Sequence, residues 1–385
     1  MKKIFILIIL LITFCPNFSF GKTTEKIPEI NARYAIVIDR SSKQILYGKN
    51  ETDKAKMAST TKIMTAIVVI ENTSLDEIAT ISSKAAKTGG SRLGLKTDDE
   101  ISINDLLYGL MLRSGNDAAI ALAEYVGGNV ESFVELMNQK AKELELISTH
   151  FVTPHGLDDD EHYTTAYDLA ILTDYALQNN TFSKIVATKT YTITINNSSK
   201  KISNTNELLG NFDGIYGVKT GFTNGANRCL VTACKRDDLD VICVVLGCDT
   251  KKDRKQDTID LLNYIFNSFS AINIETIIDT NFESWRLLHT NSFTINKGTS
   301  QILKLYLDHS QLPYSLAIVN NSELENISTP IYFNTQYEAP LYANSIIGTL
   351  SFSVNDDKYF SIDIKNSNTI YRKTIMDYFL YLITF

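Results

Sequence analysis

The sequence has no long block of lysine and arginine residues. Lysine and arginine total 37 against 44 acidic residues, so the formal charge is -7. Proteins that bind nucleic acids cluster cations to neutralise phosphates, so we expect no nucleic-acid partner. Internal repeats and low-complexity tracts are absent, and the five histidines form no metal-ligand pattern such as H-E-x-x-H. We expect neither a metal ion nor another cofactor.

The chain also lacks an apolar run near its N-terminus that is long enough to span a bilayer with ease. The run Ile4–Phe14 is short for a spanning helix. Two lysines precede it, and Ser19 and Gly21 lie at the spacing that signal peptidase prefers. We predict a signal peptide over residues 1–21, with an uncleaved membrane anchor as the alternative. In either case the bulk of the chain would lie outside the cytoplasm.

Cysteine is scarce: Cys15 lies in the predicted signal peptide, and four others lie on two predicted strands joined by an Asp-rich turn. Successive side chains on a strand face opposite sides, so a single metal site from all four is disfavoured. A four-residue turn would set them directly opposite each other in pairs, whereas a two-residue turn at Asp237–Asp238 would make the pairs diagonal. An exported protein permits disulfides, but we favour free, partly buried thiols. The four residues are Cys229, Cys234, Cys243 and Cys248.

The chain has 385 residues, which is longer than a usual domain with one hydrophobic core, so two domains are expected. Residues 28–270 mix helical and strand patterns, whereas residues 271–368 contain short alternating segments that predict a small all-β domain. The elements predicted in the first part are the strands Ala35–Asp39, Gln44–Tyr47, Tyr191–Ile195, Gly217–Gly221, Arg228–Cys234 and Asp240–Gly247, and the helices Thr60–Glu71, Asn104–Leu112, Asp117–Val126, Glu131–Leu146, Leu169–Leu177 and Gln256–Phe269.

The last residues, 369–385, form a possible membrane-surface tail. Arg372 and Lys373 are followed by the apolar, aromatic stretch Ile375–Phe385, which is too short to span a bilayer. An amphipathic helix lying on a membrane surface fits this pattern. The alternative is a last helix or strand of the core.

The first motif with chemical content is Ser59-Thr60-Thr61-Lys62, at the start of an apolar predicted helix. Residues three apart return to the same helix face, so the Lys62 amine can reach the Ser59 hydroxyl. A serine needs an adjacent base to act as a nucleophile. Burial and a nearby cation would lower the pKa of Lys62 enough to make it that base. Alone, the motif is common by chance.

Two further motifs follow in order. Ser114-Gly115-Asn116 lies in the break between two predicted helices, where a hydroxyl and an amide can point together into a cleft. Lys219-Thr220-Gly221 lies on a predicted strand, where a cation and a hydroxyl suit a substrate carboxylate and the glycine lets substrate backbone approach closely. Taken singly, each motif is explained as well by a helix cap or a strand end.

Taken together, the three motifs resemble those of the low-molecular-mass penicillin-binding proteins, the serine-type D-alanyl-D-alanine carboxypeptidases. This resemblance covers about residues 32–269 and implies an α/β (α+β) fold like that of penicillin-binding proteins and β-lactamases, with an antiparallel sheet flanked by helices. Further blocks that resemble the family are Ser114-Gly115-Asn116-Asp117-Ala118-Ala119, Pro154-His155-Gly156-Leu157-Asp158, His162-Tyr163-Thr164-Thr165-Ala166 and Gly217-Val218-Lys219-Thr220-Gly221-Phe222-Thr223.

The resemblance implies removal of the terminal D-alanine from peptidoglycan stem peptides, covalent binding of β-lactam antibiotics, and a location at the outer face of the cytoplasmic membrane or in the cell wall. It also implies the following roles: Ser59 forms the acyl-enzyme, Lys62 is its base, Ser114 relays a proton, Asn116 holds the peptide, Lys219 supplies positive potential, Thr220 and Arg254 bind the substrate carboxylate, Gly221 admits substrate backbone, and the N–H groups of Ser59 and Phe222 form the oxyanion hole.

One departure and two alternatives remain. The family often has Ala-Gly-aromatic shortly after its K-T-G, whereas this chain has Ala226-Asn227-Arg228. A class A β-lactamase would add a Glu-x-x-x-Asn loop well before K-T-G, and the one such pattern after Asn116, Glu207–Asn211, lies almost against it. A non-catalytic wall-binding protein on the same scaffold is a third possibility. His155 is interpreted as structural.

Overall fold

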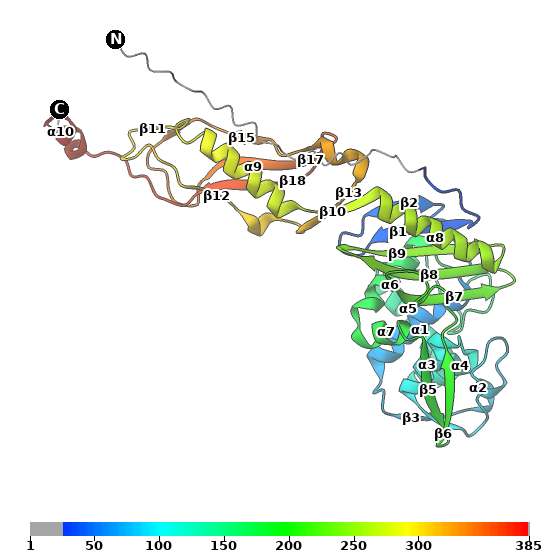
Figure 1. The fold of residues 1–385 in the computed structure, drawn as a ribbon. Helices are drawn as coiled ribbons and strands as arrows, with labels where there is room; N and C mark the ends of the chain where they lie inside the picture. The colour runs from blue at the N-terminus through cyan, green and yellow to red at the C-terminus, as the bar shows by residue number, and fades with distance from the viewer. Residues whose placement is uncertain (1–25, 384–385) are drawn as a thin grey trace, which may run out of the picture.

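The computed structural model describes residues 26–383. The predicted signal peptide, residues 1–21, lies outside the described residues, as do Cys15, Thr384 and Phe385. Figure 1 shows two parts: the elements from β1 to α8 gather in one, and the strands from β10 onward extend away from it with helix α9 beside them.

The first part is built on a five-stranded antiparallel sheet in the order β2-β1-β9-β8-β7. Helix α8 packs on β8 and β9 on one face, and α6 packs on β1 and β9 on the other. Because both faces are covered, β9 is buried along nearly its whole length. The elements are β1 (Tyr34–Asp39), β2 (Ile45–Lys49), β7 (Ile215–Thr223), β8 (Asn227–Arg236), β9 (Leu239–Cys248), α6 (Ala166–Gln178) and α8 (Lys251–Ser268).

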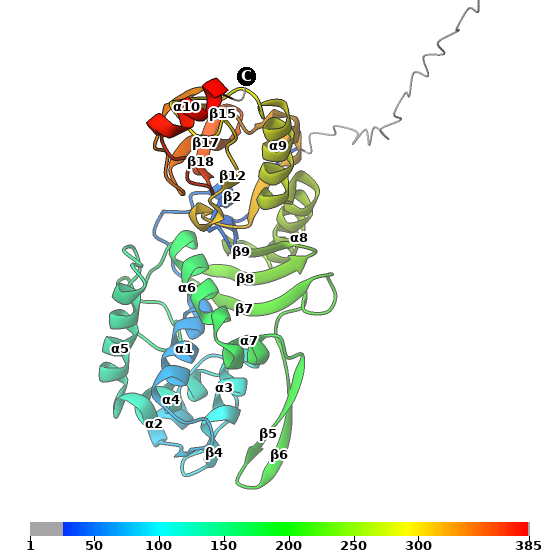
Figure 2. The same ribbon diagram turned by 90° about the vertical axis from the view of Figure 1, so that its left-hand side faces the viewer.

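A cluster of helices lies beneath this sheet, with a second sheet in the order β3-β4-β5-β6 at its edge (Figure 2). Its central helix α1 is buried from Lys62 through Val69, and α3, α4, α5 and α6 all pack against it. The elements are α1 (Lys62–Asn72), α2 (Ser83–Lys87), α3 (Ile103–Leu112), α4 (Asn116–Gly127), α5 (Val130–Glu143), α7 (Asn180–Val186), β3 (Ile78–Thr80), β4 (Glu100–Ser102), β5 (Thr190–Ile195) and β6 (Ser198–Ser203).

Side-chain caps set where several of these helices begin. The Thr165 hydroxyl accepts a hydrogen bond from the Asp168 N–H at 2.9 Å. Thr250 caps α8 in the same way through the Asp253 N–H at 3.1 Å. The closing helix therefore begins at Lys251, five residues before its predicted start, and Arg254 lies within it.

The second part confirms the predicted change to β structure. Its main sheet has the order β12-β18-β17-β14, with β15 also paired to β17. The elements are β10 (Phe269–Asn273) paired with β13 (Leu316–Asn320), β11 (Thr294–Asn296) paired with β16 (Gln336–Glu338), and β12 (Leu305–Leu307), β14 (Ile327–Ser328), β15 (Ile331–Phe333), β17 (Ile346–Val354) and β18 (Asp357–Asn366).

The fold class is thus confirmed, and this part also contains a helix that the sequence analysis did not predict. Helix α9 (Ile274–Leu288) buries Ile274, Ile278 and Phe282 against the same core as β17 and β18. The exact domain boundaries stay a prediction.

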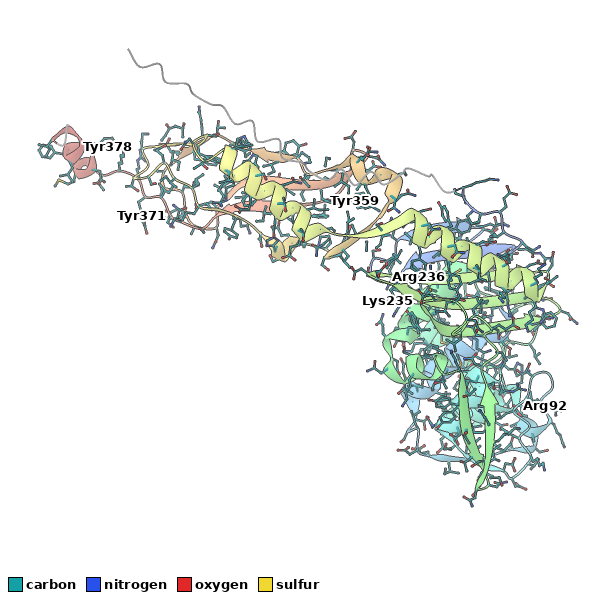
Figure 3. The ribbon with its side chains drawn as sticks, viewed as in Figure 1. Arg92, Lys235, Arg236, Tyr359, Tyr371 and Tyr378 are labelled. Atoms are coloured by element: carbon teal, nitrogen blue, oxygen red, sulfur yellow. The ribbon has the colours of Figure 1, made fainter. Side chains whose placement is uncertain are left out.

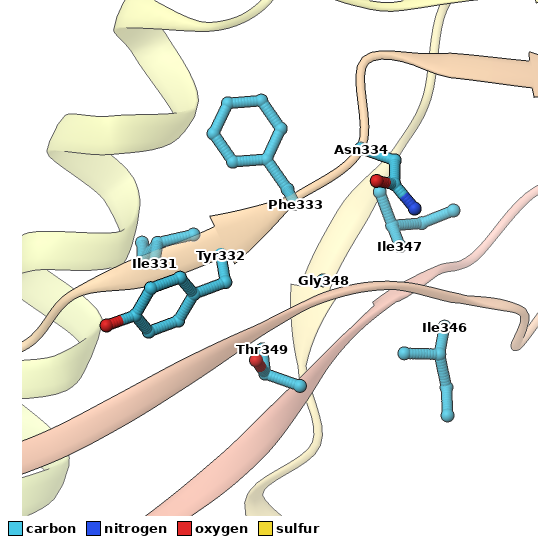
Figure 4. Close-up of a pocket in the computed structure, with 8 residues that line it drawn as sticks. All are labelled: Ile331, Tyr332, Phe333, Asn334, Ile346, Ile347, Gly348 and Thr349. Atoms are coloured by element: carbon cyan, nitrogen blue, oxygen red, sulfur yellow. The ribbon is translucent and has the colours of Figure 1, made fainter.

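A shallow groove of about 540 Å³ lies between β15 and the start of β17 (Figure 4). Tyr332 borders it with 64% of its surface exposed. Its lining is mainly apolar, and none of the predicted site residues belongs to it. The lining residues are Ile331, Tyr332, Phe333, Asn334, Ile346, Ile347, Gly348 and Thr349.

The cysteine-bearing hairpin β8–β9 has the two-residue turn. Arg236 pairs with Leu239, so Thr232 lies opposite Cys243 and Cys234 opposite Val241, which makes Cys234 and Cys243 diagonal. The thiols are free, as predicted, but they are fully buried rather than partly exposed. Burial raises the pKa of Cys229 to about 11, so this thiol stays protonated and unreactive.

The tail ends in helix α10 (Ile375–Ile383), which has one charged residue, Asp377, and projects apolar side chains into solvent. The segment before it belongs to the β structure, because Ile370 is buried and pairs with Leu341 and the Lys373 N–H donates to the Lys297 carbonyl. Figure 3 places Tyr371 and Tyr378 at the end of the molecule remote from the first part. Among residues 26–383, no helix is long and apolar enough to cross a membrane.

Candidate active site

Ser59 and Lys62 lie at the N-terminal end of α1, in contact with each other. Ser59 is in a short 3-10 turn, η1 (Ala58–Thr61), that runs directly into α1. The Lys62 Nζ lies 3.1 Å from the Ser59 Oγ, as the spacing of the two residues predicts. The Lys62 side chain is fully buried, whereas Ser59 borders an open cleft.

Two carbonyl-type oxygens complete the surroundings of the Lys62 amine. Asn116 Oδ1 is 2.8 Å from the Lys62 Nζ, and the His155 carbonyl oxygen is 2.6 Å from it. Both oxygens only accept hydrogen bonds. A neutral amine has two N–H groups and one lone pair, so these two acceptors use both N–H groups and leave the lone pair for the Ser59 hydroxyl proton. If the amine is neutral, these contacts direct its lone pair toward the Ser59 hydroxyl.

The electrostatics favour the neutral amine. Burial lowers the pKa of Lys62 well below its usual value, and the nearby Lys219 lowers it further, against a smaller opposing effect of Asp117. The Asp117 carboxylate is already occupied: it accepts hydrogen bonds from the N–H groups of Leu93, Gly94 and Leu95. That carboxylate fixes a loop at the N-terminus of α4 instead of pairing with the amine.

The second motif occupies the break between α3 and α4, as predicted. Ser114 has a φ of 59°, a left-handed conformation that is uncommon for a residue with a side chain, and it lines the cleft. Asn116 is buried and joins two walls of the site: its Oδ1 accepts from Lys62, and its Nδ2 donates to the Gly89 carbonyl at 2.8 Å.

The third motif lies on β7, the edge strand beside the Ser59 turn. A Cβ added to Gly221 would lie 3.1 Å from the Met57 carbonyl oxygen, so the glycine permits close contact with that turn. Thr220 lines the cleft, and its hydroxyl is 2.8 Å from that of Thr205. Lys219 is buried beneath, where burial and the charge of Arg254 lower its pKa to about 7.

Arg254 comes to the same cleft from α8. It is 95% buried by surface area, since only 5% is exposed, and its Nε is a buried donor that has no partner among the described atoms. Its Nη2 is 4.0 Å from Glu207 Oε2. An unpaired buried guanidinium nitrogen is costly, and its position beside the cleft suits a ligand carboxylate.

The cleft encloses about 470 Å³. Of the predicted site residues, Ser59, Ser114, Thr220, Gly221, Phe222 and Arg254 line it, and Lys62, Asn116 and Lys219 are buried close beside it. The sequence predicts no role for the other residues that line it, although Glu207 belongs to the Glu-x-x-x-Asn pattern and Arg228 to the departure after the third motif. Those other residues are Ser91, Arg113, Ser203, Asn204, Thr205, Glu207, Arg228 and Lys251.

The histidines near the site support its shape. The His162 Nδ1 accepts from the Val152 N–H at 2.9 Å, and its Nε2 is 2.8 Å from the Thr61 hydroxyl. Burial lowers the pKa of His155 to about 3, so its ring stays neutral. Gly156 has a φ of 85°, and a Cβ there would lie 1.9 Å from the Ala58 carbonyl oxygen, which shows how closely this loop covers the Ser59 turn.

Metal-ligating side chains gather elsewhere. Among the described residues, Glu275, Asp279 and His309 bring one ligand atom each within 4.8 Å of one another, in the C-terminal part. His309 Nε2 and Asp279 Oδ1 already contact each other at 2.8 Å. This group lies outside the cleft that contains Ser59.

Comparison with known proteins agrees with the motifs. The D-alanyl-D-alanine carboxypeptidase family matches residues 21–250. The chain belongs to this family. D-alanyl-D-alanine carboxypeptidase DacF of Bacillus subtilis is 31% identical to it, over 89% of this chain and 87% of the relative. DacC of Escherichia coli is 32% identical, over 90% and 86%.

Solved structures of the family share the fold. Penicillin binding protein 6B from Escherichia coli has a TM-score of 0.69 at 27% identity and covers 89% of this chain and 97% of its own. The carboxypeptidase DacD from Francisella tularensis has a TM-score of 0.67 at 26% identity, with 93% and 99% covered. The protein is therefore a serine-type D-alanyl-D-alanine carboxypeptidase, a hydrolase of cell-wall peptides.

Proposed function

We propose that the enzyme works through an acyl-enzyme on Ser59. The neutral Lys62 amine takes the hydroxyl proton, and Oγ attacks the carbonyl carbon of the penultimate D-alanine. The bond from that carbon to the leaving nitrogen breaks, and Ser114 relays a proton to the nitrogen so that D-alanine departs. Water then hydrolyses the ester and restores the Ser59 hydroxyl. The observation that carries this proposal is the contact of the buried Lys62 Nζ with Ser59 Oγ at 3.1 Å, beside the Asn116 and His155 oxygens that accept its other hydrogen bonds.

The other residues are assigned by position. Asn116 would hold the substrate peptide, and the N–H groups of Ser59 and Phe222 would stabilise the tetrahedral oxyanion, at about 3–4 kcal/mol per donor. Gly221 would admit substrate backbone along β7, a role that rests on its place in the lining of the cleft. The terminal carboxylate of the substrate would bind Thr220 and Arg254, with Lys219 adding positive potential from below.

The same acylation would bind β-lactam antibiotics covalently, because Ser59 Oγ would attack the lactam carbonyl carbon, break its bond to the ring nitrogen and leave the opened ring attached as an ester. A β-lactamase is the less favoured alternative. The Glu207 carboxylate is hydrogen-bonded to Lys251 on α8 and lies beside Arg254, so its described partners are cations of the cleft rather than Ser59. A non-catalytic wall-binding role is disfavoured because both Ser59 and Lys62 are present and in contact.

Ser59→Ala is expected to lower D-alanine release from a pentapeptide by three orders of magnitude or more, roughly the effect of losing a serine nucleophile, and to abolish labelling by fluorescent penicillin. Lys62→Ala is expected to lower both by about 10²–10⁴, the usual range for a general base. Ser83→Ala, an exposed serine on α2, is the matched control and should behave as wild type. Full penicillin labelling of Ser59→Ala would refute the assignment.

Carboxylate recognition predicts a pH-dependent preference for the free acid. C-terminal amidation replaces the negative charge of the substrate with a neutral amide and removes its charge-assisted hydrogen bonds to the enzyme. The kcat/KM of the amide should therefore be about 10–100-fold lower than that of the acid. The pKa of Lys219 is lowered to about 7, so its cation is present below this pH and is lost as the pH rises through it. KM for the acid should therefore rise above pH 7, and KM for the amide should change less. Equal turnover of acid and amide at every pH would place carboxylate recognition elsewhere.

We further propose that the enzyme is exported and that α10 holds it at the outer face of the cytoplasmic membrane. Ile375, Met376, Phe379 and Ile383 are each more than half exposed. Burying such side chains at about 25 cal/mol per Å² is enough for reversible attachment to a lipid surface. The cations Arg372 and Lys373 precede the helix and would face anionic headgroups.

A chain that ends at Thr374 tests this attachment, since it keeps the buried Ile370 and the pairing up to Lys373. It should keep wild-type penicillin labelling and peptide turnover but no longer sediment with vesicles containing phosphatidylglycerol. The full-length double variant Phe379→Glu/Ile383→Glu should lose sedimentation in the same way. Vesicle binding that survives both changes, or loss of acylation in the shortened chain, would contradict the proposal.

A further inference from the structure

Glu207 is the only acidic side chain among the described residues that line the cleft, and it faces cations. The cationic side chains that line the same cleft are Arg113, Arg228, Lys251 and Arg254. Its carboxylate is hydrogen-bonded to Lys251 and lies 4.0 Å from the Arg254 guanidinium. Lys251 is the dominant cause of the lowered pKa of Glu207, so this carboxylate is negatively charged at neutral pH.

The segment that carries Glu207 is held firmly. The Asn211 Nδ2 donates to the Glu207 carbonyl at 2.8 Å. The preceding residue, Asn206, is buried, and its Nδ2 donates a hydrogen bond to the Gly217 carbonyl on β7 at 3.2 Å. Its Oδ1 accepts a hydrogen bond from the Leu208 N–H. Glu207 therefore projects from a fixed wall that is tied to the strand bearing the third motif.

Lys251 and Arg254, the cations beside Glu207, do not stabilise the helix that carries them. Lys251 and Arg254 lie in the first turn of α8, at the positive end of the helix dipole, where cations are unfavourable and acids are preferred. The burial of Arg254 adds a desolvation cost that lowers its pKa, and Glu207 is the largest influence in the opposite direction. A carboxylate-binding role accounts for Arg254, and Glu207 then stands beside the carboxylate that Arg254 would bind.

From this placement we infer that Glu207 is a specificity-determining residue that selects the leaving D-amino acid by the charge of its side chain. The inference rests on the proposed binding of the terminal carboxylate by Thr220 and Arg254. The side chain of the leaving residue is attached one carbon from that carboxylate, which brings it near Glu207. An anionic side chain is repelled by Glu207, a neutral one such as the methyl group of D-alanine is accepted, and a cationic one is attracted.

The test uses four pentapeptides that differ in the last residue: D-alanine, D-glutamate, its neutral isostere D-glutamine, and D-lysine. The measured quantity is kcat/KM for release of that residue, expressed as the ratio of D-glutamate or D-lysine to D-glutamine. Glu207→Gln should raise the D-glutamate ratio about threefold or more, since removing one unit charge roughly 7 Å away has an effect of about threefold even at the dielectric constant of water. It should lower the D-lysine ratio.

Lys251→Gln is the opposing variant, because it leaves the Glu207 charge without its hydrogen-bonded cation. It should lower the D-glutamate ratio below that of wild type. Glu283→Gln is the matched control: Glu283 also pairs with an arginine, Arg286, and is similarly exposed, but it lies on α9. It should leave both ratios unchanged.

Unchanged ratios in Glu207→Gln and Lys251→Gln, with normal release of D-alanine, would overturn the role of Glu207 while leaving the proposed reaction intact. Shifts of the same sign in both variants would also overturn it. Failure of the wild type to release D-alanine from the first peptide would instead refute the proposed function on which the inference depends.

Discussion

The site depends on one buried amine. The Lys62 side chain is enclosed among α1, α4 and the loop before α6, in a place where a charged ammonium would lose its hydration. Two oxygens that can only accept hydrogen bonds meet its N–H groups, and its remaining contact is Ser59 Oγ at 3.1 Å. In the proposed reaction, desolvation makes Lys62 a usable base, and the two acceptors leave Ser59 as the group on which it acts.

The rest of the fold keeps this arrangement in place and supplies charge around it. Residues far apart in the chain meet there: Ser59 from η1, Asn116 from the start of α4, His155 from a loop, Lys219 from β7 and Arg254 from α8. The charge of Arg254 lowers the pKa of Lys219, and the charge of Lys219 lowers the pKa of Lys62. Each cation thus disfavours the protonated form of its neighbour. The same cations leave a positively charged cleft for an anionic substrate.

Much of this could be predicted from sequence because it depends on local spacing. The contact between Ser59 and Lys62 follows from three-residue spacing at a helix start, and the antiparallel hairpins follow from alternation and turn residues. Helix α9 was missed although Ile274, Ile278 and Phe282 recur at helical spacing, because the flanking β patterns dominated the interpretation. The early start of α8 was missed because charged residues, Lys251 to Lys255, fill its first turns.

Other features arise only from tertiary contact. Nothing local distinguishes the His155 carbonyl as a partner of Lys62, since a backbone oxygen has no sequence signal of its own. Nothing in the sequence relates Glu207 to Lys251, and the fold makes them neighbours across the cleft. The full burial of Cys234, Cys243 and Cys248 likewise depends on α8 covering β8 and β9, whereas Cys229 is buried in the helical core on the other face of the sheet.

The most direct test of the account is the protonation state of Lys62 in the free enzyme. Lysines labelled with carbon-13 at Cε can be followed by nuclear magnetic resonance as the pH is raised, with the Lys62 signal assigned from its absence in Lys62→Arg. The account predicts that this signal titrates well below the usual lysine value of 10.5, with the amine neutral at the pH of activity. A Lys62 signal that titrates near 10.5 would mean that the amine is a cation in the working enzyme, and Lys62 could not then be the base.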